Sequence, residues 1–175
     1  MVVKVEVLSS MDEFKEMDKE VLSMKLEAVE GLIRSYTNNN FQNRNMRIEA
    51  PVVDGILCGC SLYFRVGDTV QISRSKVNDG LYVITKITER GIEVDKDLYD
   101  HPQNTVTKVV YPADVQKGVI DLMIWEKKNR QKIGIKSETL SRHSVTYYDQ
   151  DAENQDMGYP TSLLGFLSPY RKPRF

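Results

Sequence analysis

The pattern of apolar and polar positions predicts two long helices on either side of a region of short strands. In the first helix, about Val21 to Tyr36, apolar residues recur every three or four positions, which is the period of a single buried face. They are Leu22, Leu26, Val29, Ile33 and Tyr36. Residues Glu27, Glu30 and Arg34 fall on the opposite side and are expected to face solvent. The run Asn38–Asn40 ends the helix, because asparagine competes for backbone hydrogen bonds and favours turns.

A second long helix is predicted from Pro112 onward. Proline at the first turn loses no hydrogen bond, and Asp114 suits the positive pole of the helix. Its apolar residues cover almost the whole circumference, as expected for a helix that packs on several sides. They are Val115, Val119, Ile120, Leu122, Met123, Ile124 and Trp125.

The segment before the first long helix also carries signals. Met1–Leu8 alternates apolar and charged residues and is predicted to be a short strand or extended arm. A short helix is expected to begin near Ser9 and Ser10, whose hydroxyl groups can cap it, with Asp12 and Glu13 in its first turn.

Between Arg47 and Val110 the period changes to short β-rich segments separated by turns. Asn78-Asp79-Gly80 is a strong turn signal ahead of the alternating segment Leu81–Ile87, and other glycines punctuate the region. Five short strands are predicted, forming a small SH3-like antiparallel β-barrel or sandwich. Residues 49–110 are therefore expected to be a module inserted into a helical core made of residues 1–48 and 111–175.

The remainder of the chain is predicted to hold a strand at Ser144–Tyr148 and a short helix at Thr161–Leu167. Two prolines in the tail that follows, Pro169 and Pro173, argue against a helix there and favour an extended arm. The predicted fold class is α+β: a small α-helical core, an inserted β module and an extended C-terminal arm.

Composition narrows the class of protein. The chain has 175 residues, of which 41% are hydrophobic and 28% charged, as in a globular domain with a real core. A formal net charge of −1 argues against a dedicated nucleic-acid binder. No apolar run approaches the roughly 20 residues of a membrane span, so no membrane partner is expected. Cys58 and Cys60, the two cysteines, are separated by one glycine and are expected to be reduced thiols.

The sequence carries no pattern that indicates catalysis. The two histidines, His101 and His143, lie in different predicted modules and are expected to be solvated. Metalloprotease, phosphate-loop, zinc-ligand and nucleophile-elbow motifs are missing from the sequence. The acidic segment 149–156 lacks the central glycine and final glutamate of an EF-hand loop. We therefore expect no enzymatic activity, no metal site and no cofactor.

Three charged segments are candidate interaction surfaces. A basic face, with no acid between its members, consists of Lys127, Lys128, Arg130, Lys132 and Lys136. An acidic arm consists of Asp149, Asp151, Glu153 and Asp156. The tail is a candidate docking arm with aromatic anchors and basic orienting groups, namely Tyr170, Arg171, Lys172, Arg174 and Phe175. A solvated helix end, a mobile loop and a frayed terminus are the respective alternatives for these three segments.

The order of these parts resembles that of a known structural family. The motifs are Ile33-Arg34-Ser35-Tyr36-Thr37-Asn38-Asn39-Asn40-Phe41, Tyr111-Pro112 with Val115-Gln116-Lys117-Gly118-Val119-Ile120-Asp121-Leu122, Ile135–Leu140 followed by Ser144–Tyr147, Gly158-Tyr159-Pro160, and Leu163–Tyr170. Together they resemble the head–tail connector, or adaptor, proteins of tailed bacteriophages of Gram-positive hosts. The resemblance covers residues 9–48 and 111–175, and the β module departs from the plainest members of that family.

The resemblance implies a structural virion protein without enzymatic activity. It implies a homo-oligomeric ring beneath the portal protein, commonly with twelve-fold symmetry, that extends the channel for passing double-stranded DNA and binds a tail-side stopper or completion protein. The isolated chain can be a monomer that assembles on the portal. Its place is the head–tail interface of the virion, after assembly in the host cytoplasm. On this interpretation the acidic arm of one subunit meets the basic face of its neighbour.

Two other classes of function remain open at this stage. A nucleic-acid-binding module would use the β insert, with Arg65, Arg74, Lys76 and Lys86 as contacts, although residues 51–111 hold seven basic and eight acidic residues. A small enzyme would need an acid–base constellation that these residues do not supply. The sequence does not decide whether the β module faces outward, lines a subunit interface or touches the tail.

Overall fold

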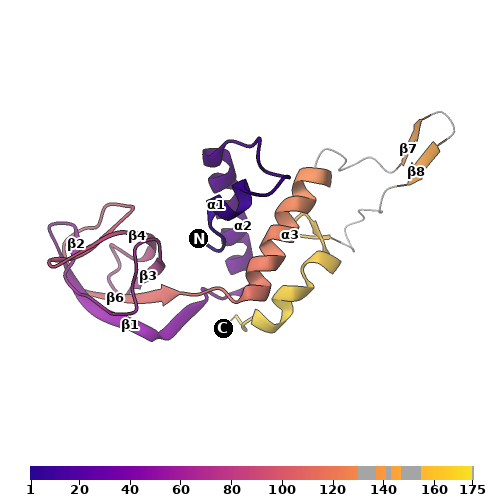
Figure 1. The fold of residues 1–175 in the computed structure, drawn as a ribbon. Coiled ribbons are helices and arrows are strands. Elements are labelled where there is room, and N and C mark those ends of the chain that lie inside the picture. Colours follow the sequence, from indigo (N-terminus) through magenta and orange to yellow (C-terminus); the bar gives the residue numbers. More distant parts are fainter. Residues whose placement is uncertain (130–136, 141–142, 147–154, 175) are drawn as a thin grey trace. The chain divides into compact units, whose positions relative to one another are not determined.

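The computed structural model describes residues 1–129, 137–140, 143–146 and 155–174, and it has the mixed helical and antiparallel β composition of an α+β protein (Figure 1). The chain divides into two compact units. The barrel unit comprises Met1 and Asn40–Tyr111, and the helical unit comprises Val2–Asn39 and Pro112–Phe175. In the sequence, the continuous barrel segment Asn40–Tyr111 thus separates the two halves of the helical unit.

The barrel unit is a closed antiparallel barrel with the strand order β1-β2-β5-β4-β3-β6. Its strands are β1 (Gln42–Val53), β2 (Ile56–Leu57), β3 (Thr69–Ser73), β4 (Gly80–Thr88), β5 (Gly91–Val94) and β6 (His101–Val109). Six strands replace the five predicted, and β1 begins at Gln42, before the expected start at Arg47. Closure gives each strand two neighbours, which removes the exposed edges that open sheets must protect.

The barrel interior holds one apolar cluster. Its buried members are Ala50, Val52, Leu57, Phe64, Val70, Ile72, Tyr82, Ile84, Ile92, Leu98 and Val106. The strands pass so close at one point that only glycine fits: Gly91 has a φ of +146°, and a Cβ there would lie 2.0 Å from the carbonyl oxygen of Leu57. Gly59 is also closely packed, since a Cβ there would lie 3.0 Å from the Cβ of Ala50.

A buried polar network organises one end of the barrel. The Asn78 side chain donates to the Tyr99 carbonyl at 2.8 Å and to Asn104 Oδ1 at 3.1 Å, and Asn104 donates to the Ala50 carbonyl at 3.0 Å. The Tyr82 hydroxyl donates to the Asn78 carbonyl at 3.0 Å. Burial, reinforced by the nearby carboxylates of Asp95 and Asp79, raises the pKa of Tyr82. These bonds satisfy polar groups that would be costly to bury alone.

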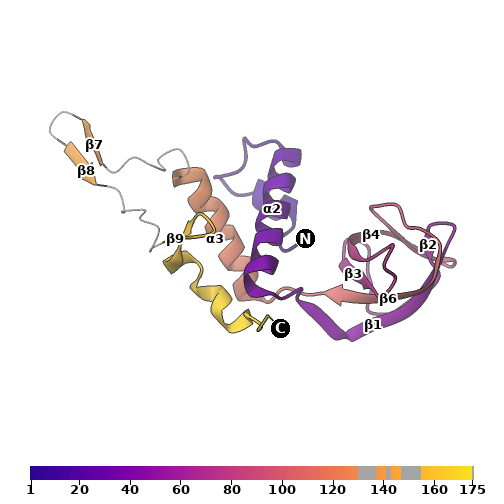
Figure 2. The same ribbon diagram turned by 180° about the vertical axis from the view of Figure 1, so that it is seen from behind.

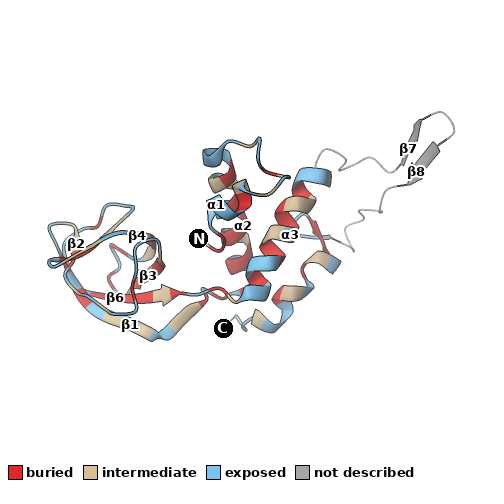
Figure 3. Cartoon of the chain, viewed as in Figure 1, coloured by how far each residue is buried: buried red, intermediate tan, exposed pale blue. Residues whose placement is uncertain are grey.

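The helical unit is built around two long helices, α2 (Lys19–Thr37) and α3 (Ala113–Asn129), which lie side by side in both views (Figures 1 and 2). Its smaller elements are α1 (Val5–Ser9), the pairs β7 (Ser137–Leu140) with β8 (His143–Thr146) and β9 (Gln155–Asp156) with β10 (Tyr159–Pro160), and the 3-10 helices η3 (Thr161–Leu163) and η4 (Gly165–Tyr170). Figure 3 shows buried residues recurring along α2 and α3, as the apolar stripes predict.

The amino-terminal segment differs from its prediction. Residues Val5–Ser9 form a helix and not a strand, because the buried positions are Val2, Val3 and Leu8, which do not follow the alternation of a strand. The helix expected after Ser9 and Ser10 is a series of turns. The two serine hydroxyls instead donate back to the carbonyls of Glu6 and Val7, so they mark the end of α1.

Helix α2 starts and stops with recognisable caps. The Asp18 carboxylate accepts from the backbone N–H groups of Glu20 and Val21, so α2 begins slightly earlier than predicted. At the other end Asn38 adopts a left-handed conformation with φ of 48°, which confirms the expected stop at the asparagine run.

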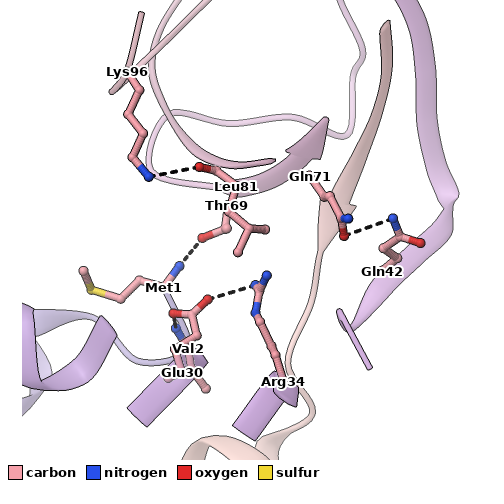
Figure 4. Close-up of polar contacts among 9 residues, drawn as sticks. All are labelled: Met1, Val2, Glu30, Arg34, Gln42, Thr69, Gln71, Leu81 and Lys96. Atoms are coloured by element: carbon pink, nitrogen blue, oxygen red, sulfur yellow. Dashed lines mark hydrogen bonds and ion pairs between the residues drawn. The ribbon is translucent and has the colours of Figure 1, made fainter. Parts of the chain in front are cut away.

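The prediction that Glu30 and Arg34 of α2 face solvent is wrong. Both are buried and form an ion pair of 2.9 Å along one side of the helix (Figure 4). The second carboxylate oxygen of Glu30 accepts from the Val2 backbone N–H at 2.9 Å. The pair therefore serves to fasten the amino-terminal segment to α2.

The C-terminal segment is also more ordered than predicted. Pro169 lies inside η4, so this part of the tail is helical despite the proline. Leu164 and Leu167 are buried, and the Phe166 ring approaches Gly118 of α3 so closely that a Cβ on that glycine would lie 2.5 Å from the ring. A glycine in the middle of α3 thus makes room for η4.

Candidate docking surfaces

The helical unit contains a groove with a volume of about 560 Å³ between α2, the end of α3 and the β9–β10 turn. We call it the α2 groove. Its apolar walls are Val21, Met24, Ala28, Leu32, Trp125 and Met157. Methionine side chains adapt to different partners, and Met24 is 63% exposed. A groove of this size and chemistry can hold several apolar side chains.

A polar cluster fixes the geometry at the wall of the α2 groove. Lys25 of α2 donates to one carboxylate oxygen of Glu126 at 2.9 Å, and the Tyr159 hydroxyl donates to the other at 2.9 Å. The Trp125 ring lies 5.6 Å from the Tyr159 ring, centroid to centroid. Because these residues come from α2, α3 and β10, the cluster ties together the three elements that line the groove.

The sequence pattern was not interpreted as predicting the α2 groove. The visible signal is a second apolar stripe on α2, in which Val21, Met24, Ala28 and Leu32 follow spacings of three, four and four. This stripe runs beside the buried one that the sequence analysis identified. The helical unit leaves part of this second stripe uncovered, since Val21 and Met24 are exposed.

The predicted docking arm lies against its own chain. The backbone N–H of Lys172 donates to the Thr37 carbonyl at 2.8 Å, and the Arg174 guanidinium donates to the Ser35 carbonyl at 2.6 Å. The Arg171 guanidinium lies 4.8 Å from the centre of the Tyr36 ring. The tail thereby satisfies carbonyl groups that the end of α2 leaves without intrahelical partners. Phe175 lies outside the described residues.

Asparagine side chains complete this clasp. Asn38 donates to the Pro173 carbonyl at 2.8 Å, and Asn39 donates to the Tyr170 carbonyl at 3.1 Å. The Tyr170 hydroxyl donates to the Asp114 carboxylate at 2.9 Å, and this hydrogen bond raises the pKa of the Tyr170 phenol. The asparagine run therefore has a second role, which is to hold the C-terminal tail.

The predicted basic face is only partly described. Lys127 donates to the Glu13 carbonyl, and its ammonium group lies 5.9 Å from the centre of the Phe14 ring. The Lys128 ammonium lies 3.7 Å from the Glu13 carboxylate. These two lysines thus contact the turn that follows α1. Arg130, Lys132 and Lys136 lie where the structure describes no side chains.

The predicted acidic arm also lies mostly outside the described residues. Asp149, Asp151 and Glu153 belong to that part of the chain. Asp156 is described: it is exposed, lies in β9 and pairs through its backbone with Tyr159 of β10. The proposed contact between the acidic arm and the basic face therefore stays a prediction.

The structure spreads the predicted nucleic-acid contacts over the barrel. Arg74 and Lys76 follow the last residue of β3, whereas Arg65 precedes its first residue, so the length of the strand separates them. Lys86 of β4 forms an ion pair of 3.3 Å with Glu93 of β5. The four side chains do not gather into one basic surface.

A second apolar feature belongs to the barrel unit. Between β2 and β3, the loop of residues 61–66 exposes Leu62 (94%), Tyr63 (58%) and Val66 (62%), while Phe64 between them is 4% exposed and anchors the loop in the core. Three exposed large apolar side chains within five residues make this loop a candidate interaction surface.

The remaining chemical groups are dispersed. His101 is the first residue of β6, where its Nδ1 lies 2.8 Å from the Gln103 carbonyl oxygen, and the backbone of His143 lies in β8. Cys58 and Cys60 are exposed free thiols. Across the described residues, no three His, Cys, Asp or Glu side chains come together as metal ligands, and none of the described helices has the length and hydropathy of a membrane span.

Comparison with known proteins adds no relative to this description. Neither a protein-family model nor a curated protein matches the sequence.

Proposed function

We propose that this chain is a head–tail connector of a tailed bacteriophage, a structural virion protein that joins the DNA-filled head to the tail. One observation carries the proposal. The two segments that resemble connector proteins, residues 9–48 and 111–175, are separated by the β module in the sequence, yet most of their residues, 9–39 and 112–175, fold into one helical unit, while residues 40–48 and 111 belong to the barrel unit. In that unit α2, α3 and η4 contact one another. A resemblance in two separate pieces is more meaningful when the pieces form a single body.

The way in which the β module joins the helical unit supports an insertion. The chain enters the barrel through β1 and leaves through β6, and these strands are paired neighbours, with Gln42 opposite Val109. The Val110 N–H also donates to the Phe41 carbonyl at 2.9 Å. Because entry and exit lie together, a connector can carry such a module without separating its helical halves. We propose an SH3-like barrel for this insert.

The proposed role is structural and not enzymatic. Subunits form a closed ring beneath the portal, commonly twelve-fold, through head-to-tail contacts between unlike surfaces. The ring extends the channel through which double-stranded DNA passes without sequence recognition, and its far side receives the tail-side stopper or completion protein. The α2 groove and the exposed 61–66 loop are two unlike surfaces of the kind that such an assembly requires.

Co-sedimentation with the cognate portal ring tests this function. The chain is expected to move through a density gradient with the portal at a fixed ratio of subunits, whereas alone it sediments as a smaller species. An unrelated portal of the same size is the control for trapping. A chain that stays at the top of the gradient at every mixing ratio would contradict the connector role.

A further inference from the structure

We propose that the 61–66 loop of one copy binds the α2 groove of a second copy, so that identical chains associate head to tail. The two features have matching chemistry. The loop exposes three apolar side chains, and the groove is walled mainly by apolar ones. The inference names the subunit contact of the proposed connector ring and in that respect rests on the proposed function, although the contact itself is argued from these two surfaces.

The loop is built to present its apolar side chains. Phe64 anchors it in the barrel core, and the Phe64 N–H donates to the Ser61 carbonyl at 3.1 Å. The Lys108 ammonium donates to the Tyr63 carbonyl at 3.1 Å and pairs with Asp68 at 2.6 Å, next to the loop. A loop held from several sides loses little conformational entropy on binding, so its exposed side chains contribute efficiently to affinity.

The groove fits an apolar plug better than a charged ligand. Its charged groups, Lys25 and Glu126, already pair with each other at 2.9 Å, and Tyr159 holds the second oxygen of Glu126. Met24 on one wall is 63% exposed and Val21 beside it is 39% exposed, so burial of these side chains by a partner is favourable. The match of apolar loop to apolar groove selects a second copy of this chain as the occupant.

The geometry of the contact follows from its composition. Loop and groove are different surfaces on different units, so each copy offers one of each and the contact is heterologous. Such contacts leave a free loop at one end of a dimer and a free groove at the other. Association therefore continues beyond the dimer, and it closes into a ring where the rotation allows.

Two exposed positions permit a direct test in the full-length chain. Leu62→Asp alters only the loop and Met24→Asp only the groove, and both side chains are more than half exposed, so neither substitution disturbs a core. Sedimentation velocity over a wide concentration range should show self-association of the wild type that weakens about tenfold or more in either variant. Matched controls are Val77→Asp and Val7→Asp, at exposed apolar positions outside both surfaces, which should associate like the wild type.

Mixing the two variants gives the sharpest result. The Leu62→Asp chain keeps a functional groove and the Met24→Asp chain keeps a functional loop, so the mixture should form a dimer with one chain of each kind and nothing larger. High salt should leave this dimer intact, because an apolar contact is not screened as ion pairs are. A mixture that stays monomeric would overturn the proposal, as would a wild type that is monomeric throughout or variants that associate normally.

The outcomes separate this contact from the connector role. If the wild type does not self-associate, or the variants associate normally, while the wild type still sediments with the portal ring, the proposed contact is wrong and the proposed function stands. If the mixed variants form the dimer but the wild type never binds a portal, the head-to-tail contact stands and the connector role falls.

Discussion

The barrel unit and the helical unit differ in how completely they bury their apolar side chains. In the barrel, six strands each have two neighbours and enclose one apolar cluster. In the helical unit, α2 buries one apolar stripe and leaves a second along an open groove, where Met24 is 63% exposed. The barrel is complete by itself apart from the 61–66 loop, whereas the helical unit presents surface that a partner can cover. In the proposed assembly the helical unit therefore supplies the open groove, and the barrel unit supplies only the 61–66 loop.

The largest expected effect comes from breaking the barrel at Gly91. Alanine there would place a Cβ 2.0 Å from the Leu57 carbonyl oxygen at a φ of +146°, so strands β2 and β5 must separate. We expect Gly91→Ala to lower the free energy of unfolding of the barrel by about 3 kcal/mol or more. Amide hydrogen exchange of β4 and β5 measures this loss.

A matched control separates crowding from backbone strain. Gly67 has a φ of +87°, but a Cβ there meets nothing within 4 Å. Gly67→Ala should therefore cost only about 1 kcal/mol. Trp125, the single tryptophan, lies in the helical unit, and its fluorescence should report no change in either variant. An equal shift of the Trp125 transition would show that the two units unfold as one.

The next effect concerns the buried ion pair of the helical unit. Glu30→Gln leaves the Arg34 guanidinium buried without its carboxylate partner, and we expect a loss of about 3 kcal/mol in the free energy of unfolding. Urea denaturation followed by Trp125 fluorescence measures it. The exposed pair Lys117–Asp121 is the control, and Asp121→Asn should cost less than about 1 kcal/mol. Equal losses would mean that burial of the Glu30 pair is unimportant.

Two helix glycines give a smaller effect with opposite signs. A Cβ added at Gly31 of α2 would meet nothing within 4 Å, so Gly31→Ala should stabilise the helical unit by up to about 1 kcal/mol. A Cβ at Gly118 of α3 would lie 2.5 Å from the Phe166 ring, so Gly118→Ala should displace η4 and destabilise the unit by about 1–2 kcal/mol. Thermal unfolding of both variants tests the pair, and stabilisation by Gly118→Ala would show that η4 moves freely.

The smallest effect is the pH dependence of the C-terminal clasp. The hydrogen bond to Asp114 raises the pKa of Tyr170 above its unfolded value of about 10. Its stabilisation is therefore fully present below about pH 10 and is lost as pH rises through the raised pKa. The urea midpoint of Tyr170→Phe should lie slightly below that of the wild type at neutral pH, and the difference should vanish at high pH. Tyr99→Phe, at an exposed position, should leave the urea midpoint at neutral pH unchanged.

The sequence predicted those elements whose signal is local and periodic. The buried stripe of α2, its stop at Asn38, the helix after Pro112 and the turn before β4 were all predicted, because each depends on nearby residues. One local signal was overlooked: Asp54-Gly55 is a two-residue hairpin loop with φ values of 53° and 74°, and it creates β2.

The features that were missed depend on contacts distant in sequence. Its place in the sequence pattern predicts that Glu30 is a surface residue. In the fold it is buried, where it pairs with Arg34 and accepts from the Val2 N–H. The tail has the composition of a free arm, and its sequence gives no sign of the docking, because the contact of Lys172 with the end of α2 forms only in the folded chain. The α2 groove needs Trp125 and Met157 to become a groove at all. Surfaces of this kind form through tertiary packing, which cannot be predicted from the apolar periodicity of a single helix.

Electron cryo-microscopy of the chain mixed with its cognate portal ring tests the central claim most directly. The account predicts a coaxial ring of added density in which the helical units contact the portal and one another, with each barrel meeting the neighbouring helical unit through its 61–66 loop. Bare portal rings beside free chain, or chains attached to the portal only through their barrels, would contradict the account.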